Sequence, residues 1–186
     1  LDSGYLDLML LHGGDGWGIS PERDEALWRG LIAAQKAGKV RSIGVSNHNR
    51  EEVERLITKT KVVPAVNQLE FHPWVPAETR DLVRWCQEKG IVVTAYGSLG
   101  GSVNKARGEV VSQVAKNYGK TNAQGLLTKK SDAFDDHMHK PRLTEEHIRE
   151  DLDLNFHLEK KDAQLIETSS APQYFTRWRN CRSGCA

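Results

Sequence analysis

The sequence has few cysteines and lacks a long hydrophobic run. Its three cysteines are Cys86, Cys181 and Cys185. This odd, sparse count argues against a disulfide framework and favours a reducing compartment, and the last two lack the C-x-x-C spacing of zinc sites. No apolar stretch approaches the roughly 20 residues that span a bilayer, and no signal peptide is visible. We therefore expect a cytoplasmic protein with free thiols.

A net charge of either sign is also missing. The chain has 26 basic and 25 acidic residues, so no excess charge attracts nucleic acid or an anionic membrane. Its 186 residues suffice for one domain with a hydrophobic core. The chain opens at Leu1 with no initiator methionine and no lead-in before the first strand, which favours a piece of a longer product.

Four apolar runs of strand length alternate with helical patterns. The predicted strands are residues 5–12, 39–47, 62–68 and 91–96, and a spacing of about 25 to 30 residues indicates βαβ units with a parallel sheet. The first run is nearly continuous, which predicts a strand buried on both faces. Ser20, Asn49 and Ala77 begin the predicted helices, and Leu27, Leu31 and Ala34 are expected on the inward face of the first helix.

Residues 39–47 are the stretch around which the other motifs are arranged. Gly44 lets another backbone approach closely, and Ser46 and Asn47 follow at the carboxyl end of the strand, where α/β proteins place their ligands. The same pattern also fits an ordinary strand end with an Asx turn.

Each predicted strand ends in a polar or aromatic side chain. These are His12, Ser46 with Asn47, Gln68 and Tyr96, and in a (β/α) barrel all would face one mouth. The glycine-rich segment after His12 does not match G-x-G-x-x-G, so we interpret it as a loop at the rim of a pocket rather than a phosphate cradle.

The later part of the chain is less regular. Helices are predicted over residues 110–118, 121–127, 144–153 and 158–168, the last with Ala163, Leu165 and Ile166 inward. Residues 129–140 show no strand pattern, and their histidines and aspartates fit a charged surface loop better than a metal site. We expect one domain over residues 1–170 and a disordered tail over 171–186.

Four motifs carry a resemblance to a known family. Residues 8–12 (LMLLH), 38–47 (GKVRSIGVSN), 67–73 (NQLEFHP) and 95–100 (AYGSLG) resemble those of the aldo-keto reductases in letters, order and spacing. The resemblance implies an NADPH-dependent oxidoreductase that reduces small-molecule aldehydes or ketones to alcohols. It also implies an α/β fold, a partial (β/α)8 TIM barrel with the early strands absent and the eighth strand degenerate.

The resemblance also implies roles for particular residues. His12 matches the family's active-site histidine, which orients the carbonyl and assists proton donation. Ser46, Asn47 and Gln68 would hold the nicotinamide carboxamide, and Tyr96 would stack on the ring. Further cofactor contacts would come from Leu99, Arg142 and Glu150. No metal is implied.

Departures from the family pattern set a second expectation. The catalytic tyrosine, with its aspartate and lysine partners, comes from strands before the one that ends in His12, so we expect little or no turnover by this chain alone. Lys140 and Arg142 lie out of register with the residues that bind the adenosine 2′-phosphate in the family. The choice between NADPH and NADH is therefore left open. The alternative is an inactive remnant that acts as a binding or assembly module and self-associates through open sheet edges.

Overall fold

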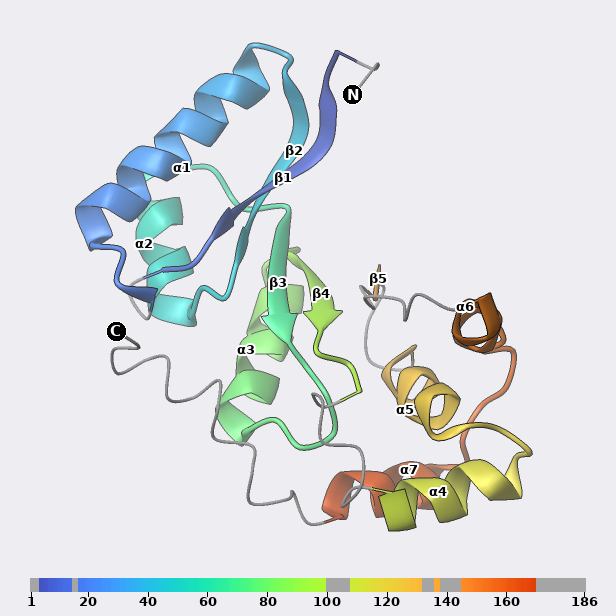
Figure 1. Cartoon of the computed structure of the whole chain (residues 1–186). Helices are drawn as coiled ribbons and strands as arrows, with labels where there is room; N and C mark the ends of the chain where they lie inside the picture. The colour runs from blue at the N-terminus through green and yellow to red at the C-terminus, as the bar shows by residue number, and fades with distance from the viewer. Residues whose placement is uncertain (1–3, 15–16, 100–107, 132–135, 138–144, 170–186) are drawn as a thin grey trace. The chain divides into compact units, whose positions relative to one another are not determined.

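The computed structural model describes the chain apart from residues 1–3, 15–16, 100–107, 132–135, 138–144 and 170–186 (Figure 1). None of the described helices is both long and apolar enough to cross a membrane. In chain order the elements are β1 (Leu6–His12), α1 (Pro21–Lys36), β2 (Val40–Ser46), α2 (Arg50–Thr60), β3 (Val66–Glu70), α3 (Ala77–Glu88), β4 (Val92–Tyr96), α4 (Gly108–Asn117), α5 (Asn122–Ser131), β5 (Asp136–His137), α6 (Glu145–Leu152) and α7 (Lys160–Thr168).

The strands form one sheet in the order β1-β2-β3-β4-β5. β1 pairs with β2 in parallel, and β2 pairs with β3 in parallel. The alternation of strands with helices α1, α2 and α3 confirms the predicted βαβ organisation. β5 is only two residues long, in keeping with a degenerate eighth strand.

The chain divides into two compact units. The first holds the described parts of residues 1–69 and 77–94, and the second holds those of 70–76 and 95–176. In the first unit, α1 packs against β1, β2 and α2, and Figure 1 shows α1 and α2 on the same side of these strands. The core of this unit contains the fully buried Trp28, Val45 and Leu56.

Local capping chemistry sets the helix starts of the first unit. The Ser20 side chain accepts a hydrogen bond from the backbone N–H of Arg23 at the start of α1. Asn49 and Glu52 form a reciprocal capping box at the start of α2, which satisfies two otherwise unpaired N–H groups. These two starts are the ones the sequence predicts.

Two predictions about burial in the first unit are wrong. Leu27 is 42% exposed, and the inward positions of α1 are instead Asp24 and Trp28. β1 is not buried on both faces, since Leu8 is 42% and Met9 43% exposed. On α1, the buried carboxylate of Asp24 and the indole of Trp28 occupy the inward face where apolar residues were predicted. β1 pairs with a single strand, β2, among the described residues.

Two further predictions differ from the structure, the bounds of β3 and the orientation of Leu165. β3 covers Val66–Glu70 rather than residues 62–68, so Gln68 lies inside the strand and not at its last position. In α7, Ala163 and Ile166 are buried as predicted, but Leu165 is 49% exposed, because it falls on the opposite side of the helix from the core. The expected tail lies outside the described residues.

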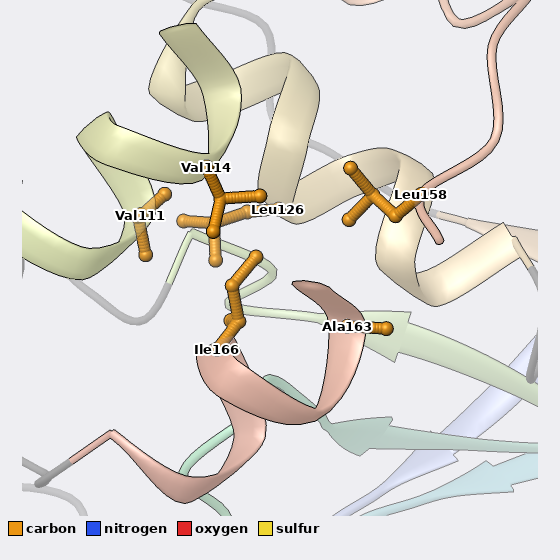
Figure 2. Packing of buried hydrophobic residues seen from close by; sticks show 6 residues of the cluster. All are labelled: Val111, Val114, Leu126, Leu158, Ala163 and Ile166. Atoms are coloured by element: carbon orange, nitrogen blue, oxygen red, sulfur yellow. The ribbon is translucent and has the colours of Figure 1, made fainter. Parts of the chain in front are cut away.

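The second unit has its own hydrophobic core, made by helices α4, α5 and α7 and the segment before α7. Figure 2 shows Val111, Val114, Leu126 and Ile166 pointing toward one another. Leu158 and Ala163 complete the buried cluster.

Polar contacts of Tyr118 tie two parts of the second unit together. The Tyr118 hydroxyl donates to Asp162 Oδ2 at 2.6 Å and accepts from the backbone N–H of Glu159 at 2.9 Å. Since Tyr118 follows α4 and Asp162 lies in α7, these bonds fix one helix against the other.

Candidate active site at the strand ends

The carboxyl ends of β1, β2 and β3 lie side by side in the first unit. His12 is in register with Ser46, and Ser46 with Gln68. Two backbone hydrogen bonds continue this alignment beyond β2, from Gly13 N–H to Ser46 O (3.0 Å) and from Asn47 N–H to Gln68 O (2.9 Å). Four of the predicted site residues are therefore brought together along the carboxyl-terminal edge of the sheet, where the strands end.

Close approach of β2 and β3 at Gly44 makes this alignment possible. A Cβ atom at Gly44 would lie 2.5 Å from the carbonyl oxygen of Val66 and 2.8 Å from Cδ2 of Leu10. Neither distance is compatible with a side chain. The close approach that the sequence predicts at Gly44 is confirmed, and the position accepts only glycine without movement of β3.

Ser46 and Asn47 differ in how they face their surroundings. Ser46 is 2% exposed, and its hydroxyl donates to the backbone carbonyl of Gln68 at 3.1 Å. Asn47 is half-buried and adopts a left-handed backbone conformation, with φ of 62°. Asparagine tolerates this region better than most residues. Gln68 is also half-buried, so the two amide side chains, rather than the hydroxyl, reach the surface of this edge.

His12 is exposed and contacts an aromatic side chain of the following loop. Its ring centroid lies 5.2 Å from that of Trp17 in an edge-on arrangement with an interplanar angle of 63°. Trp17 is 41% exposed. The ring nitrogens of His12 can donate a hydrogen bond to a ligand, and the neighbouring indole can pack against the same ligand.

The glycine loop packs against a carboxylate. A Cβ at Gly14, where φ is 146°, would lie 2.9 Å from both carboxylate oxygens of Glu52, and Glu52 is 3% exposed. A buried carboxylate beside the loop repels a phosphate. The interpretation of this segment as a loop at the rim of a pocket stays a prediction.

A buried polar cluster behind the edge escaped the sequence analysis. Asp24 and His48 are both fully buried and lie 2.9 Å apart, from Oδ1 to Nε2. Arg55 donates to the other Asp24 oxygen at 3.2 Å, and Asn67 donates to the backbone carbonyl of His48 at 2.9 Å. The available signal was a histidine directly after Ser46 and Asn47. Asp24 gave no such signal, because an acid near the start of a helix normally faces solvent.

The remaining predicted residues belong to the second unit. Tyr96 is half-buried, and its carbonyl accepts from the N–H of Phe71 at 3.0 Å. Leu99 packs against the hydrophobic cluster of this unit, and the Glu150 carbonyl accepts from the side chain of Gln124 at 3.1 Å. Arg142 lies outside the described residues.

The described residues contain no cluster suited to a metal ion. No group of three or more His, Cys, Asp or Glu side chains in that part of the chain is placed to hold a cation. The prediction of a loop without strand over residues 129–140 is wrong where the structure describes this segment, since residues 129–131 end α5 and Asp136–His137 form β5. The other residues of the segment lie outside the described part of the chain.

Comparison with known proteins decides the family. The model of the aldo/keto reductase family matches residues 1–155. The chain belongs to the aldo/keto reductase family. A Bacillus subtilis relative, the uncharacterized oxidoreductase YtbE, is 34% identical over 170 residues, which are 88% of this chain and 55% of that protein. The NAD/NADP-dependent indole-3-acetaldehyde reductase of Schizosaccharomyces pombe is 39% identical over 110 residues, which are 59% of this chain and 39% of that protein.

Solved structures agree with this assignment. A mutant of Gox0644 in complex with NADPH superposes with a TM-score of 0.75 at 30% identity, and covers 89% of this chain and 59% of that chain. The fold predicted from sequence, a partial aldo/keto reductase TIM barrel, is thereby confirmed. The chain spans about 40 to 60% of the length of these relatives.

Proposed function

We propose that this chain supplies the nicotinamide-binding edge of an NADPH-dependent aldo/keto reductase that converts aldehydes or ketones to alcohols. The observation that carries the proposal is the in-register alignment of His12, Ser46 and Gln68, with Asn47 held beside them. We place the protein in the cytoplasm, since the buried Cys86 is unpaired.

The chemistry of the edge fits a nicotinamide. A carboxamide needs both a donor and an acceptor, and the half-buried amides of Asn47 and Gln68 each carry both. When bound, NADPH would supply the hydride for carbonyl reduction. His12 would orient the carbonyl oxygen, because it is exposed and carries ring nitrogens that can donate a hydrogen bond.

Binding and turnover are separate parts of this proposal. Protonation of the alkoxide that forms on reduction needs a general acid, and the family's tyrosine has no counterpart at the matching order in residues 1–186. We therefore expect this chain to bind NADPH yet to oxidise it slowly or not at all with a reactive aldehyde. Turnover at the rate of a full-length reductase would contradict this expectation.

Fluorescence titration with NADPH tests the binding part. Asn47→Ala should weaken binding about 10-fold to 100-fold, since one to two hydrogen bonds to the carboxamide are lost. Asn155→Ala, which makes the same chemical change at an exposed position, is the matched control and should bind like the wild type. No binding by the wild type, or equal binding by both variants, would refute the proposal.

Exposed apolar side chains on β1 favour a second candidate, an assembly module that self-associates. Leu8 and Met9 are 42% and 43% exposed, and burial of such side chains stabilises association. Sedimentation velocity of the wild type should then show a dimer that Leu8→Gln dissociates. Leu27→Gln is the matched control, because Leu27 is also 42% exposed but lies on α1. A monomeric wild type would exclude this candidate.

A further inference from the structure

We propose that Asp24 and His48 are positioning residues for cofactor binding: together they hold the backbone around Asn47 in the conformation that presents its amide to the nicotinamide. The inference rests on the proposed function, because it assigns a cause to the geometry of the same edge. Neither residue touches the cofactor in this proposal, and each acts through Asn47.

The His48 ring faces inward and bridges two elements. Its Nε2 lies 2.9 Å from Asp24 Oδ1 in α1, and its Nδ1 lies 3.2 Å from the carbonyl oxygen of Ser46 at the end of β2. His48 and Asp24 are both completely buried. A hydrogen-bonded path therefore runs from α1 through the imidazole to the residue immediately before Asn47.

Hydrogen-bond chemistry defines what this bridge requires. The Ser46 carbonyl can only accept, so Nδ1 of His48 carries the hydrogen of that contact, while Nε2 and the Asp24 carboxyl group share a hydrogen between them. The buried carboxylate is compensated on its second oxygen by Arg55, whose Nη2 lies 3.2 Å from Oδ2. A buried carboxylate with one partner removed is strongly unfavourable, so the three side chains act as a unit.

The backbone on both sides of Asn47 is fixed by this unit and its neighbours. Before Asn47, the Ser46 carbonyl accepts from Gly13 N–H as well as facing the His48 ring. After it, the His48 carbonyl accepts from Asn67 Nδ2 at 2.9 Å. The left-handed φ of 62° at Asn47 is energetically unfavourable for a non-glycine residue. Such a conformation persists where several contacts hold it in place, as the hydrogen bonds to the Ser46 and His48 carbonyls do here.

Loss of the bridge should therefore raise the entropic cost of binding rather than remove a contact with the cofactor. A binding residue that must be ordered when the ligand arrives weakens affinity by a modest factor. For both Asp24→Ala and His48→Leu, we expect NADPH to bind about threefold to tenfold more weakly than to the wild type. Amide hydrogen exchange across residues 46–48 should become faster in the absence of any ligand.

A conservative variant separates positioning from simple packing. In Asp24→Asn the introduced amide can donate to Nε2 of a neutral His48 ring and accept from Arg55, so Nδ1–H still donates to the Ser46 carbonyl. This variant should keep NADPH affinity within about twofold of the wild type and keep slow exchange at residues 46–48. A purely structural loss of stability would not predict this rescue.

Thr60→Val is the matched control for stability. It removes the hydrogen bond from Trp28 Nε1 to Thr60 Oγ1 (3.2 Å) in the same unit, at the opposite end of α2 from the Asn47 backbone. Urea unfolding of every variant should accompany the titrations. Thr60→Val should lower the urea midpoint and leave both NADPH affinity and exchange at residues 46–48 unchanged.

The outcomes distinguish the two proposals. If the wild type does not bind NADPH, the proposed function fails and this inference fails with it. If the wild type binds but His48→Leu and Asp24→Ala bind equally well, only the positioning role is overturned. Should one of these two variants not fold, the other still decides together with Asp24→Asn, because a weakened variant beside a wild-type-like Asp24→Asn supports the bridge and any other pair of results overturns it.

Discussion

Replacing Gly44 with alanine should destabilise the first unit and distort the candidate site together. The new Cβ would sit 2.5 Å from the Val66 carbonyl oxygen and 2.8 Å from Leu10 Cδ2. Ordinary van der Waals contact begins near 3.4 Å, so β3 must move away from β2 by roughly 1 Å. Overpacking of this kind typically costs about 1–3 kcal/mol. The Asn47 N–H to Gln68 O bond, now 2.9 Å, would lengthen and add about 1 kcal/mol.

Gly30→Ala is the control for this prediction, because it makes the same chemical change without a clash. Gly30 lies within α1, and an added Cβ there would meet no atom within 4 Å. Alanine in a helix interior is favoured over glycine by about 0.8–1.0 kcal/mol, so this variant should be more stable than the wild type. The two substitutions are therefore expected to shift stability in opposite directions.

Hydrogen exchange followed by mass spectrometry over residues 40–46 is the appropriate assay. The chain contains two compact units, so a whole-chain unfolding signal need not report a single two-state transition. Gly44→Ala should lower the opening free energy of this segment by about 2–4 kcal/mol. Protection equal to or greater than that of the wild type would refute the argument, since the clash with a backbone atom would then have been absorbed without cost.

Two further predictions concern pKa values. Burial raises the pKa of the Cys86 thiol from 9.0 to about 11, so at pH 8 its thiolate fraction falls about 100-fold. In a chain that also carries Cys181→Ser and Cys185→Ser, iodoacetamide should label Cys86 slowly in buffer and rapidly in urea. Equal labelling rates in the two solvents would contradict this prediction. A hydrogen bond from Lys120 at 2.6 Å holds the pKa of Asp153 below its usual 3.8. The contribution of this pair to folding stability is therefore complete above about pH 4 and is lost as the pH falls through the lowered pKa. The urea midpoint of Lys120→Met should approach that of the wild type in acid, and a constant difference between the two midpoints at every pH would count against the pair.

The parts of the fold that depend on local chemistry could be predicted from the sequence. The starts of α1 and α2 follow from Ser20 and Asn49, whose side chains cap nearby N–H groups whatever the rest of the chain does. Gly44 was identified because a glycine among β-branched residues indicates a close backbone approach. In each case the physical cause lies within a few residues of the observed structure.

Features that depend on distant partners could not be predicted in this way. Asp24 looks like a helix-start acid in the sequence, yet it is buried because His48 and Arg55, 24 and 31 residues later, come to it through the fold. The exposure of Leu8 and Met9 has a similar origin. The spacing and number of apolar residues indicate that a strand exists, but only the strands and helices beside it determine which of its faces are covered.

The candidate site combines both kinds of information, and this separates two residues that the family resemblance treats alike. Ser46 and Asn47 are adjacent, and the motif assigns both to the carboxamide. Because the Ser46 hydroxyl donates to the Gln68 carbonyl and is almost fully buried, its main effect is to bind β2 to β3. Asn47 then stands one residue beyond the end of β2, with its N–H bonded to the Gln68 carbonyl and its backbone held from both sides. In our proposal, affinity for the nicotinamide therefore depends on how rigidly this single asparagine is held, and the buried hydrogen-bonded bridge of Asp24 and His48 determines that rigidity.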